Sequence, residues 1–186
     1  CGIVGPLPEE LADCKHLQSI ELGNNPLTGA VIPEYWGEHM QELEYLGIYN
    51  TELSGELPRS IGGMKSLKKL FLASNKISGT IPESIGQLPV VEELLLSGNQ
   101  LTGSIPESMV NLPRLKDLTL HSNYFQGSIP KVFQETDNWK NFWPDILDNN
   151  EFDISNVRFY GPSFKDIKTL DGKTISDDIY SKNKLT

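Results

Sequence analysis

One phrase, Gly-x-(Ile or Leu)-Pro, returns at nearly constant intervals along the first two thirds of the chain. It begins at Gly5, Gly55, Gly79, Gly103 and Gly127. A sixth copy, GAVIP, contains one extra residue, and the last three steps are 24 residues each. An interval of this length is typical of proteins built by stacking one structural unit many times. The sequence therefore predicts an array of similar units.

A second column lies four positions before each glycine, and most of its members are asparagines. Its members are Cys1, Asn25, Thr51, Asn75, Asn99 and Asn123. Apolar residues precede the column at fixed distances; before Asn99 they are Val91, Leu94 and Leu96, and Leu101 follows it. The Leu-x-Leu alternation predicts a short strand with one face turned inward. Strands of successive units would then stack in parallel, with every apolar column, from Ile3 in the first unit onward, facing the core.

The asparagine column has a structural explanation. After each strand the chain must turn a corner, which leaves backbone N–H and C=O groups without partners in the sheet. A side-chain amide carries both donors and an acceptor. Because an unpaired buried group costs about 1–3 kcal/mol, we expect each asparagine to serve corner groups of its own and the neighbouring turn. Thr51 and Cys1 can donate at the same position, more weakly.

The segments after the Ile-Pro phrase predict short helical turns on the outer side. From Pro82 onward, apolar residues stand three positions apart, at Ile85, Leu88 and Val91. The turn after Asn25 departs from the pattern, since it is two residues longer than the others.

These columns, with LTGSIP at Leu101 and ISGTIP at Ile77, resemble the plant-type leucine-rich repeat, LxxLxxLxLxxNxLTGxIPxxLxxL. The resemblance covers roughly residues 1–133. It implies an α/β, β-rich solenoid: a right-handed superhelix with a concave parallel sheet and short 3-10 or helical turns outside. It also implies recognition of proteins or peptides.

The pattern divides the chain into three segments. Residues 1–133 hold the repeats, the first of them incomplete. Residues 134–158 are expected to form a C-terminal cap, because bulky aromatic residues such as Trp139 and Phe142 can cover the last apolar layer of an open solenoid. Residues 159–186 contain LDGK, a hairpin signal.

This last segment resembles the entry to a periplasmic thioredoxin-like domain of the TlpA/ResA type, in which a W-C-x-x-C motif follows. This chain does not contain that motif. The alternative is a generic tail that bears a hairpin.

A binding site is expected on the strand surface, among side chains that the repeat pattern leaves free. Aromatic and apolar residues on a strand surface that meets water mark recognition sites, although ordinary β-propensity also explains them. Lys69 and Glu93 are expected to pair across neighbouring strands. The candidate residues on the concave face are Tyr45, Tyr49, Lys69, Phe71, Glu93, Leu95, Thr119 and His121.

Composition and motifs argue against several other functions. The net charge is -9, with 16 basic residues scattered among 25 acidic ones, which disfavours a nucleic-acid partner. No run of 18 apolar residues predicts a transmembrane segment. The three histidines lack metal-ligand spacing, and the cluster Asp145, Asp148, Glu151 and Asp153 does not match a calcium loop. No phosphate loop or nucleophile elbow occurs, so neither cofactor, metal nor catalysis is expected.

The two cysteines are each expected to be small buried residues. Cys1 stands in the asparagine column, and Cys14 stands in an outer apolar column with Met64 and Leu88. These two places make a mutual disulfide geometrically poor. Alternatively, Cys1 is the lipid-bearing first residue of a mature lipoprotein. Because the repeat starts at once, further turns are expected upstream.

No N-x-(Ser/Thr) glycosylation acceptor occurs in the chain, and paired cap cysteines are missing. Both are usual in plant receptor ectodomains, so their absence favours a bacterial cell-envelope or secreted protein, in the periplasm or at the cell surface. We predict a monomeric module that binds a protein or peptide and has no catalysis of its own. The alternative is a substrate-presenting region of a larger thiol–disulfide oxidoreductase whose catalytic CxxC part is missing here.

Overall fold

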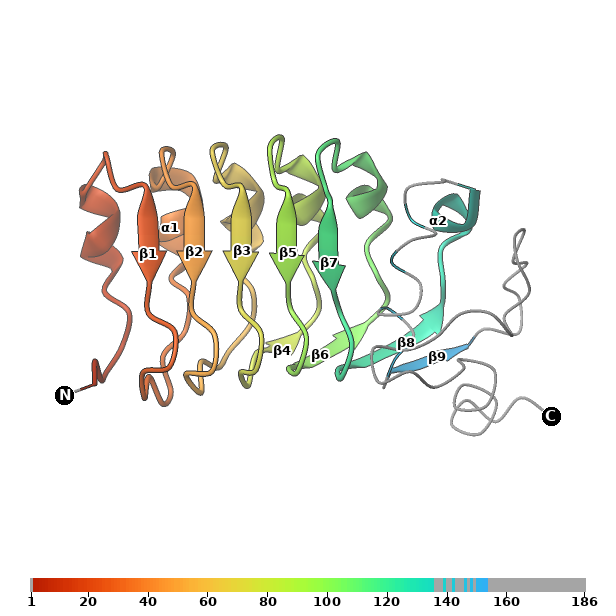
Figure 1. The fold of residues 1–186 in the computed structure, drawn as a ribbon, viewed down its shortest axis with the longest axis horizontal. Coiled ribbons are helices and arrows are strands. Elements are labelled where there is room, and N and C mark those ends of the chain that lie inside the picture. The colour runs from red at the N-terminus through yellow and green to blue at the C-terminus, as the bar shows by residue number, and fades with distance from the viewer. Residues whose placement is uncertain are drawn as a thin grey trace.

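The chain winds into a stack of similar turns (Figure 1). The structure, a computed structural model, describes residues 2–135, 139, 142, 146, 148 and 150–153. Five parallel strands form the main sheet, in the order β1-β2-β3-β5-β7, and the middle residue of each strand pairs with the middle residue of the next. This constant register confirms the stacking predicted from the Leu-x-Leu columns. The strands are β1 (Ser19–Glu21), β2 (Tyr45–Gly47), β3 (Lys69–Phe71), β5 (Glu93–Leu95) and β7 (Asp117–Thr119).

A second parallel sheet, here called the lateral sheet, lies at the next corner of each turn (Figure 1). Its order is β4-β6-β8-β9, and the sequence indicated it only as a short extended piece before each Ile-Pro. Its strands are β4 (Ser78–Gly79), β6 (Gln100–Gly103), β8 (Tyr124–Ser128) and β9 (Glu151–Asp153).

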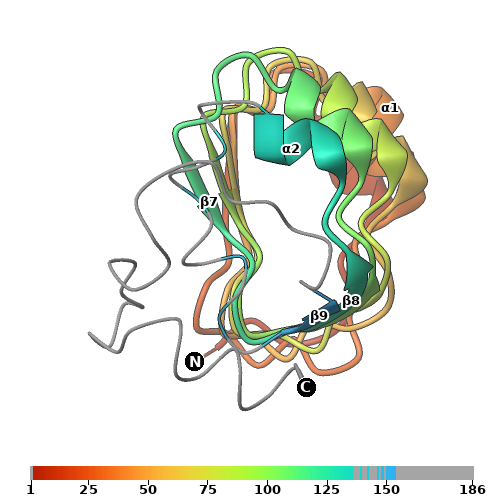
Figure 2. The same ribbon diagram turned by 90° about the vertical axis from the view of Figure 1, so that its right-hand side faces the viewer.

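The helical turns lie across the core from the main sheet (Figure 2). Four are 3-10 helices: η1 (Glu9–Asp13), η2 (Arg59–Gly63), η3 (Glu83–Gln87) and η4 (Glu107–Asn111). Two are α-helices, α1 (Glu34–His39) and α2 (Lys131–Glu135). One of the two extra residues of the turn after Asn25 falls in the helical segment, where α1 has six residues and each 3-10 helix has five. Trp36 of α1 is fully buried, and the indole N–H donates to the Pro8 carbonyl at 3.1 Å.

The interior is filled by the apolar columns. The central strand residues Leu46, Leu70 and Leu94 are all 0% exposed, as expected for side chains covered by a turn on each side. The first turn differs, because within the described chain it has a neighbour on one side only. Ile3, which the sequence placed in a core column, is therefore 54% exposed.

Cys14 is also exposed, which corrects the expectation that it is buried. It follows η1 directly, at the same end of the stack as Ile3. Its column partners Met64 and Leu88 are fully buried because turns flank them on both sides. Cys14 is a free thiol, and Cys1 lies outside the described residues.

The asparagine column forms a ladder of hydrogen bonds between turns. The Asn99 amide donates to the Leu72 carbonyl of the preceding turn at 2.9 Å and to the Leu96 carbonyl of its own turn at 3.0 Å. Its oxygen accepts from the Ile77 N–H of the preceding turn at 3.1 Å. One side chain thus joins two corners, and the same pattern recurs at the neighbouring asparagines on either side.

The other members of the column keep the ladder with small changes. Asn25 accepts from the Ile3 N–H at 3.0 Å and donates to the Leu22 carbonyl at 2.9 Å. Thr51 is buried, and its hydroxyl donates to the Asn75 amide oxygen at 2.9 Å. The threonine therefore depends on the asparagine of the next turn for its own partner.

The ladder continues one turn beyond the last asparagine that the sequence pattern identified. The buried Asn150 donates to the Leu120 carbonyl at 3.1 Å and to the Ile146 carbonyl at 2.9 Å, and it accepts from the Phe125 N–H at 3.2 Å. In addition, β9 pairs in parallel with β8. The repeat geometry thus reaches into the segment expected to be a cap. The boundaries at 133 and 158 stay predictions, and residues 159–186 lie outside the described residues.

Replacing Asn99 by alanine tests the ladder. The change leaves the Ile77 N–H and the Leu72 and Leu96 carbonyls without this partner, in a site that is 5% exposed. We expect the free energy of unfolding to fall by at least about 1–3 kcal/mol, measured by urea denaturation followed by circular dichroism. The exposed neighbour Gln100 is the control, and its alanine variant should stay within about 0.5 kcal/mol of the wild type. Equal stability of the two variants would contradict this role.

Candidate binding face

The outward surface of the main sheet, here called the sheet face, carries the eight candidate residues. Side chains alternate along a strand, so the first and third residue of each strand stand outward when the middle one is buried. Tyr49 and His121 follow two residues after β2 and β7. All eight are half-buried, although the sequence analysis expected exposed aromatic rings. Their burial comes from contacts with one another and with neighbouring turns.

Two glycines of the face leave gaps that tyrosine rings fill. A Cβ atom on Gly23 would lie 2.7 Å from Cε1 of Tyr49, and one on Gly47 would lie 2.7 Å from Cζ of Tyr45. The rings therefore lie along the sheet and cover the backbone. An aromatic ring over a glycine is a known way of stabilising a strand that lacks a side chain.

A continuous chain of contacts joins the rings of Tyr45 and Phe71 to charged groups. The Tyr45 hydroxyl donates to the Glu21 carboxylate, and the Tyr45 ring meets Phe71 edge to face with centroids 5.4 Å apart. The Lys69 ammonium lies 6.0 Å from the Phe71 centroid and forms an ion pair with Glu93 at 2.7 Å, as expected across neighbouring strands. Edge-to-face rings and a cation near a ring each add about 0.5–1.5 kcal/mol. The β1–β3 half of the face is thus a preformed network.

The pKa of Tyr45 reports the electrostatic character of this half. Burial raises it above its ordinary value, and the hydrogen bond to Glu21 and the nearby Glu21, Tyr49 and Glu93 charges raise it further. Each of these causes disfavours the tyrosinate form. Burial and the neighbouring Glu21 and Glu93 carboxylates thus keep the Tyr45 hydroxyl in its neutral, hydrogen-bond-donating form.

The β5–β7 half is less closed on itself. Glu93 stands directly opposite the exposed Asp117 in the register of the two strands, an arrangement that is unfavourable for like charges. Next to them, Thr119 donates to the Ser97 hydroxyl at 3.2 Å, and Leu95 is half-buried. This half offers an apolar side chain, hydroxyls and carboxylates.

Glu21 and Ser97 complete the network. Ser97, like Leu95, occupies a position that the repeat leaves free and was predicted to belong to the face, whereas Glu21 was not predicted as a site residue. The available signal was their position beside the candidate columns: Glu21 is in register with Gly47 and Thr119 with Leu95, so both contacts run diagonally between columns, within reach of such side chains. Their contacts to Tyr45 and Thr119 depend on rotamers that a sequence does not give.

At the border where the strands begin, charges alternate from turn to turn. Lys68 pairs with Glu44 at 2.7 Å, and Lys116 pairs with Glu92 at 2.6 Å. The hydrogen bond from Lys116 lowers the pKa of the Glu92 carboxyl. Because the charges of this border are paired with one another, they are largely neutralised.

Over the part of the chain that the structure describes, no group of three or more His, Cys, Asp or Glu side chains is placed to hold a metal ion. Likewise, no helix among these residues is long and apolar enough to cross a bilayer.

A family model described as leucine rich repeat matches residues 15–77, 41–101 and 66–125. A comparison with curated protein sequences gave no significant match.

Several solved structures are similar to the chain. The Arabidopsis receptor kinase HAESA, in complex with the peptide hormone IDA and the co-receptor SERK1, is 32% identical with a TM-score of 0.69, covering 80% of this chain and 24% of that one. PEPR1 with AtPEP1 is 32% identical with a TM-score of 0.69, covering 90% and 23%. A plant ice-binding protein is 25% identical with a TM-score of 0.66, covering 90% and 60%. The chain spans about a quarter of the two receptor chains. One architecture therefore serves different functions, which must be argued from the site.

The raised pKa of Tyr45 gives a test of the network. In the wild type we expect Tyr45 to stay protonated near pH 10, where an unperturbed tyrosine ionises. In Glu21→Gln its pKa should fall but stay above the ordinary value, because burial is the largest cause. Because the folded-state pKa is raised, the associated stability is present below about pH 10 and is lost as pH rises through the folded-state value.

The measurement is an NMR titration of the Tyr45 ring carbons over the range in which the protein stays folded. Glu52→Gln, which removes a carboxylate paired with Lys76 and not with Tyr45, is the control. An unchanged Tyr45 titration in Glu21→Gln would show that this hydrogen bond does not form in solution.

Proposed function

The chain belongs to the leucine-rich repeat family, and from this premise we propose that it binds a protein or peptide on the sheet face. The observation that carries the proposal is the network of half-buried side chains on this face, none of which the repeat requires. The similar structure of HAESA is described as a receptor kinase in complex with a peptide hormone, which supports a peptide or protein as ligand. No catalytic step is proposed for this chain.

The proposed contacts divide according to the two halves of the face. Phe71 and Leu95 supply apolar surface in register on β3 and β5, and such residues near the centre of an interface carry much of the affinity. The rings of Tyr45 and Tyr49 are packed over Gly47 and Gly23 before any ligand binds. Fewer side chains then need to be ordered on binding, which lowers its entropy cost. Polar contacts at the border would come from Lys69, Glu93, Thr119 and His121.

We also propose a bacterial cell-envelope or secreted setting, in the periplasm or at the cell surface, with Cys1 as a possible site of lipidation. The lack of any N-x-(Ser/Thr) acceptor supports this origin. Similar structures include ectodomains of receptor kinases, which supports a setting outside the cytoplasm. A monomer is proposed, since the stack needs no second copy to build the face.

Selection of peptides tests the site. A random-peptide phage library would be selected on the wild type, and the enriched peptides would be measured by calorimetry. We expect Phe71→Ala and Leu95→Ala each to weaken binding about tenfold or more, equivalent to about 1.4 kcal/mol. Tyr124, which is 55% exposed on the lateral sheet, is the matched control. Full affinity in both face variants would place the peptide elsewhere.

A second candidate rests on residues 159–186, which lie outside the described residues. Their resemblance to the entry of a thioredoxin-like domain supports a substrate-presenting role for a larger thiol–disulfide oxidoreductase. The test is the coding sequence after Thr186. A W-C-x-x-C motif soon after it is expected under this candidate, and a stop codon would exclude it.

A further inference from the structure

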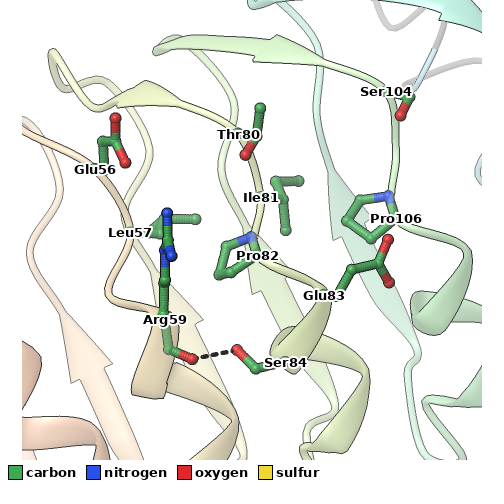
Figure 3. A pocket seen from close by; sticks show the side chains of 10 residues that line it. All are labelled: Glu56, Leu57, Arg59, Thr80, Ile81, Pro82, Glu83, Ser84, Ser104 and Pro106. Atoms are coloured by element: carbon green, nitrogen blue, oxygen red, sulfur yellow. Dashed lines mark hydrogen bonds between the residues drawn. The ribbon is translucent and has the colours of Figure 1, made fainter.

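A groove of about 500 Å³ lies where the lateral sheet passes into the helical turns (Figure 3). It runs across three successive turns and receives Glu56, Thr80 and Ser104 from equivalent positions, 24 residues apart. Binding sites for small ligands have volumes of roughly 300–1,000 Å³. None of its residues belongs to the sheet face, so the groove is a separate candidate site.

The floor of the groove is apolar and rigid. Leu57 and Ile81 are each 3% exposed, which makes them part of the core. Beside them lie Pro82 and Pro106 (Figure 3). Pro106 is buried and Pro82 is half-buried. Because proline fixes its backbone φ angle, Pro82 presents most of the accessible C–H surface of the floor in a fixed position.

One rim is held in place by glycines of the following turns. A Cβ atom on Gly79 would lie 2.8 Å from Cγ of Glu56, and one on Gly103 would lie 2.9 Å from Cγ2 of Thr80. These glycines have φ of +74° and +76°, where a larger residue is strained. The exposed side chains of Glu56 and Thr80 therefore pack against the backbone of the following turn, where a residue larger than glycine would displace them.

The opposite rim carries charges that have no ion-pair partner. The Arg59 N–H donates to Glu34 at 2.9 Å, and the Arg59 carbonyl accepts from the Ser84 hydroxyl at 2.7 Å, so its backbone is fixed. Among the described residues, no salt bridge involves the Arg59 guanidinium, although the carboxylates Glu56 and Glu83 line the same groove. The groove therefore offers the Arg59 guanidinium as a hydrogen-bond donor and the Glu56 and Glu83 carboxylates as acceptors, with no ion pair between them among the described residues.

We propose that this groove binds a neutral saccharide, one or two sugar rings long. An anion would meet two carboxylates, and a cation would meet the guanidinium. A hydroxyl group both donates and accepts, so neighbouring sugar hydroxyls can donate to Glu56 or Glu83 and accept from Arg59. The C–H face of a sugar ring matches the floor of proline, leucine and isoleucine.

A peptide strand fits this groove less well. Strand addition needs unpaired main-chain N–H and C=O groups along an edge. Here the main chain of the lateral sheet is paired from turn to turn: the Ser78 N–H donates to the Gly55 carbonyl and the Gln100 N–H donates to the Ile77 carbonyl, both at 2.8 Å. The groove therefore offers side chains, and these suit a ligand with many hydroxyl groups.

The test is titration of the whole chain with four neutral trisaccharides, cellotriose, maltotriose, mannotriose and N,N′,N″-triacetylchitotriose, followed by amide NMR shifts and calorimetry. We expect at least one to bind with a dissociation constant below about 10 mM, with shifts at Thr80 and Ser104. Arg59→Met and Glu83→Gln should each weaken it about tenfold, or about 1.4 kcal/mol. Lys76→Ala, outside the groove, is the matched control.

Either of two results would overturn the proposal: no shift in the groove with any of the four saccharides, or unchanged affinity in both variants. Unperturbed amide spectra away from the groove would show that the variants fold. If the groove amides respond to the phage-selected peptides and to no saccharide, the ligand class is wrong. Peptide binding at the sheet face is measured separately, so either proposal can fail alone.

Discussion

The hydrogen bonds between each ladder asparagine and the corner backbone are the constraint on which the structure depends. Each amide serves carbonyl groups of two successive turns, and its oxygen accepts from the preceding turn, as Asn99 and Asn123 show. One turn therefore cannot shift against the next without leaving buried polar groups unpaired. The constant strand register of the main sheet follows. Because the turns cannot shift, the apolar columns also stack into one core.

A fixed register also fixes which side chains are neighbours on the surface. Because Gly23 and Gly47 leave gaps, the rings of Tyr49 and Tyr45 lie on the sheet and turn a row of separate residues into a network. The same regularity at another corner places Glu56 and Thr80 over glycines of the following turns. The repeat thus builds two different surfaces, a partly aromatic face with charged side chains and a polar groove with an apolar floor. Both are made from positions that the repeat leaves free.

The sequence was sufficient for the strands, the ladder and the helical turns, because these depend on residues that recur at a fixed interval. It was insufficient where the interval changes. Asn150 follows Asn123 by 27 residues and binds the carbonyl four positions earlier, whereas Asn123 binds the one three positions earlier. Burial of Cys14 was mispredicted because a column position predicts burial only when turns lie on both sides. The sequence identified the face residues, yet rings lying on glycines arise from packing between turns that no single repeat encodes.

Native-state hydrogen exchange of the backbone N–H groups bound to the ladder is the most direct test of whether the asparagine hydrogen bonds hold the turns in register. The amides of Ile77, Leu101 and Phe125 each donate to an asparagine side chain of the following turn. We expect these three amides to exchange as slowly as the strand amides of β3 and β5. In Asn150→Ala we expect fast exchange of the Phe125 amide and unchanged exchange of the other two. Exchange of the Ile77 and Leu101 amides at the rate of solvent-exposed loops in the wild type would contradict the ladder and the register that depends on it.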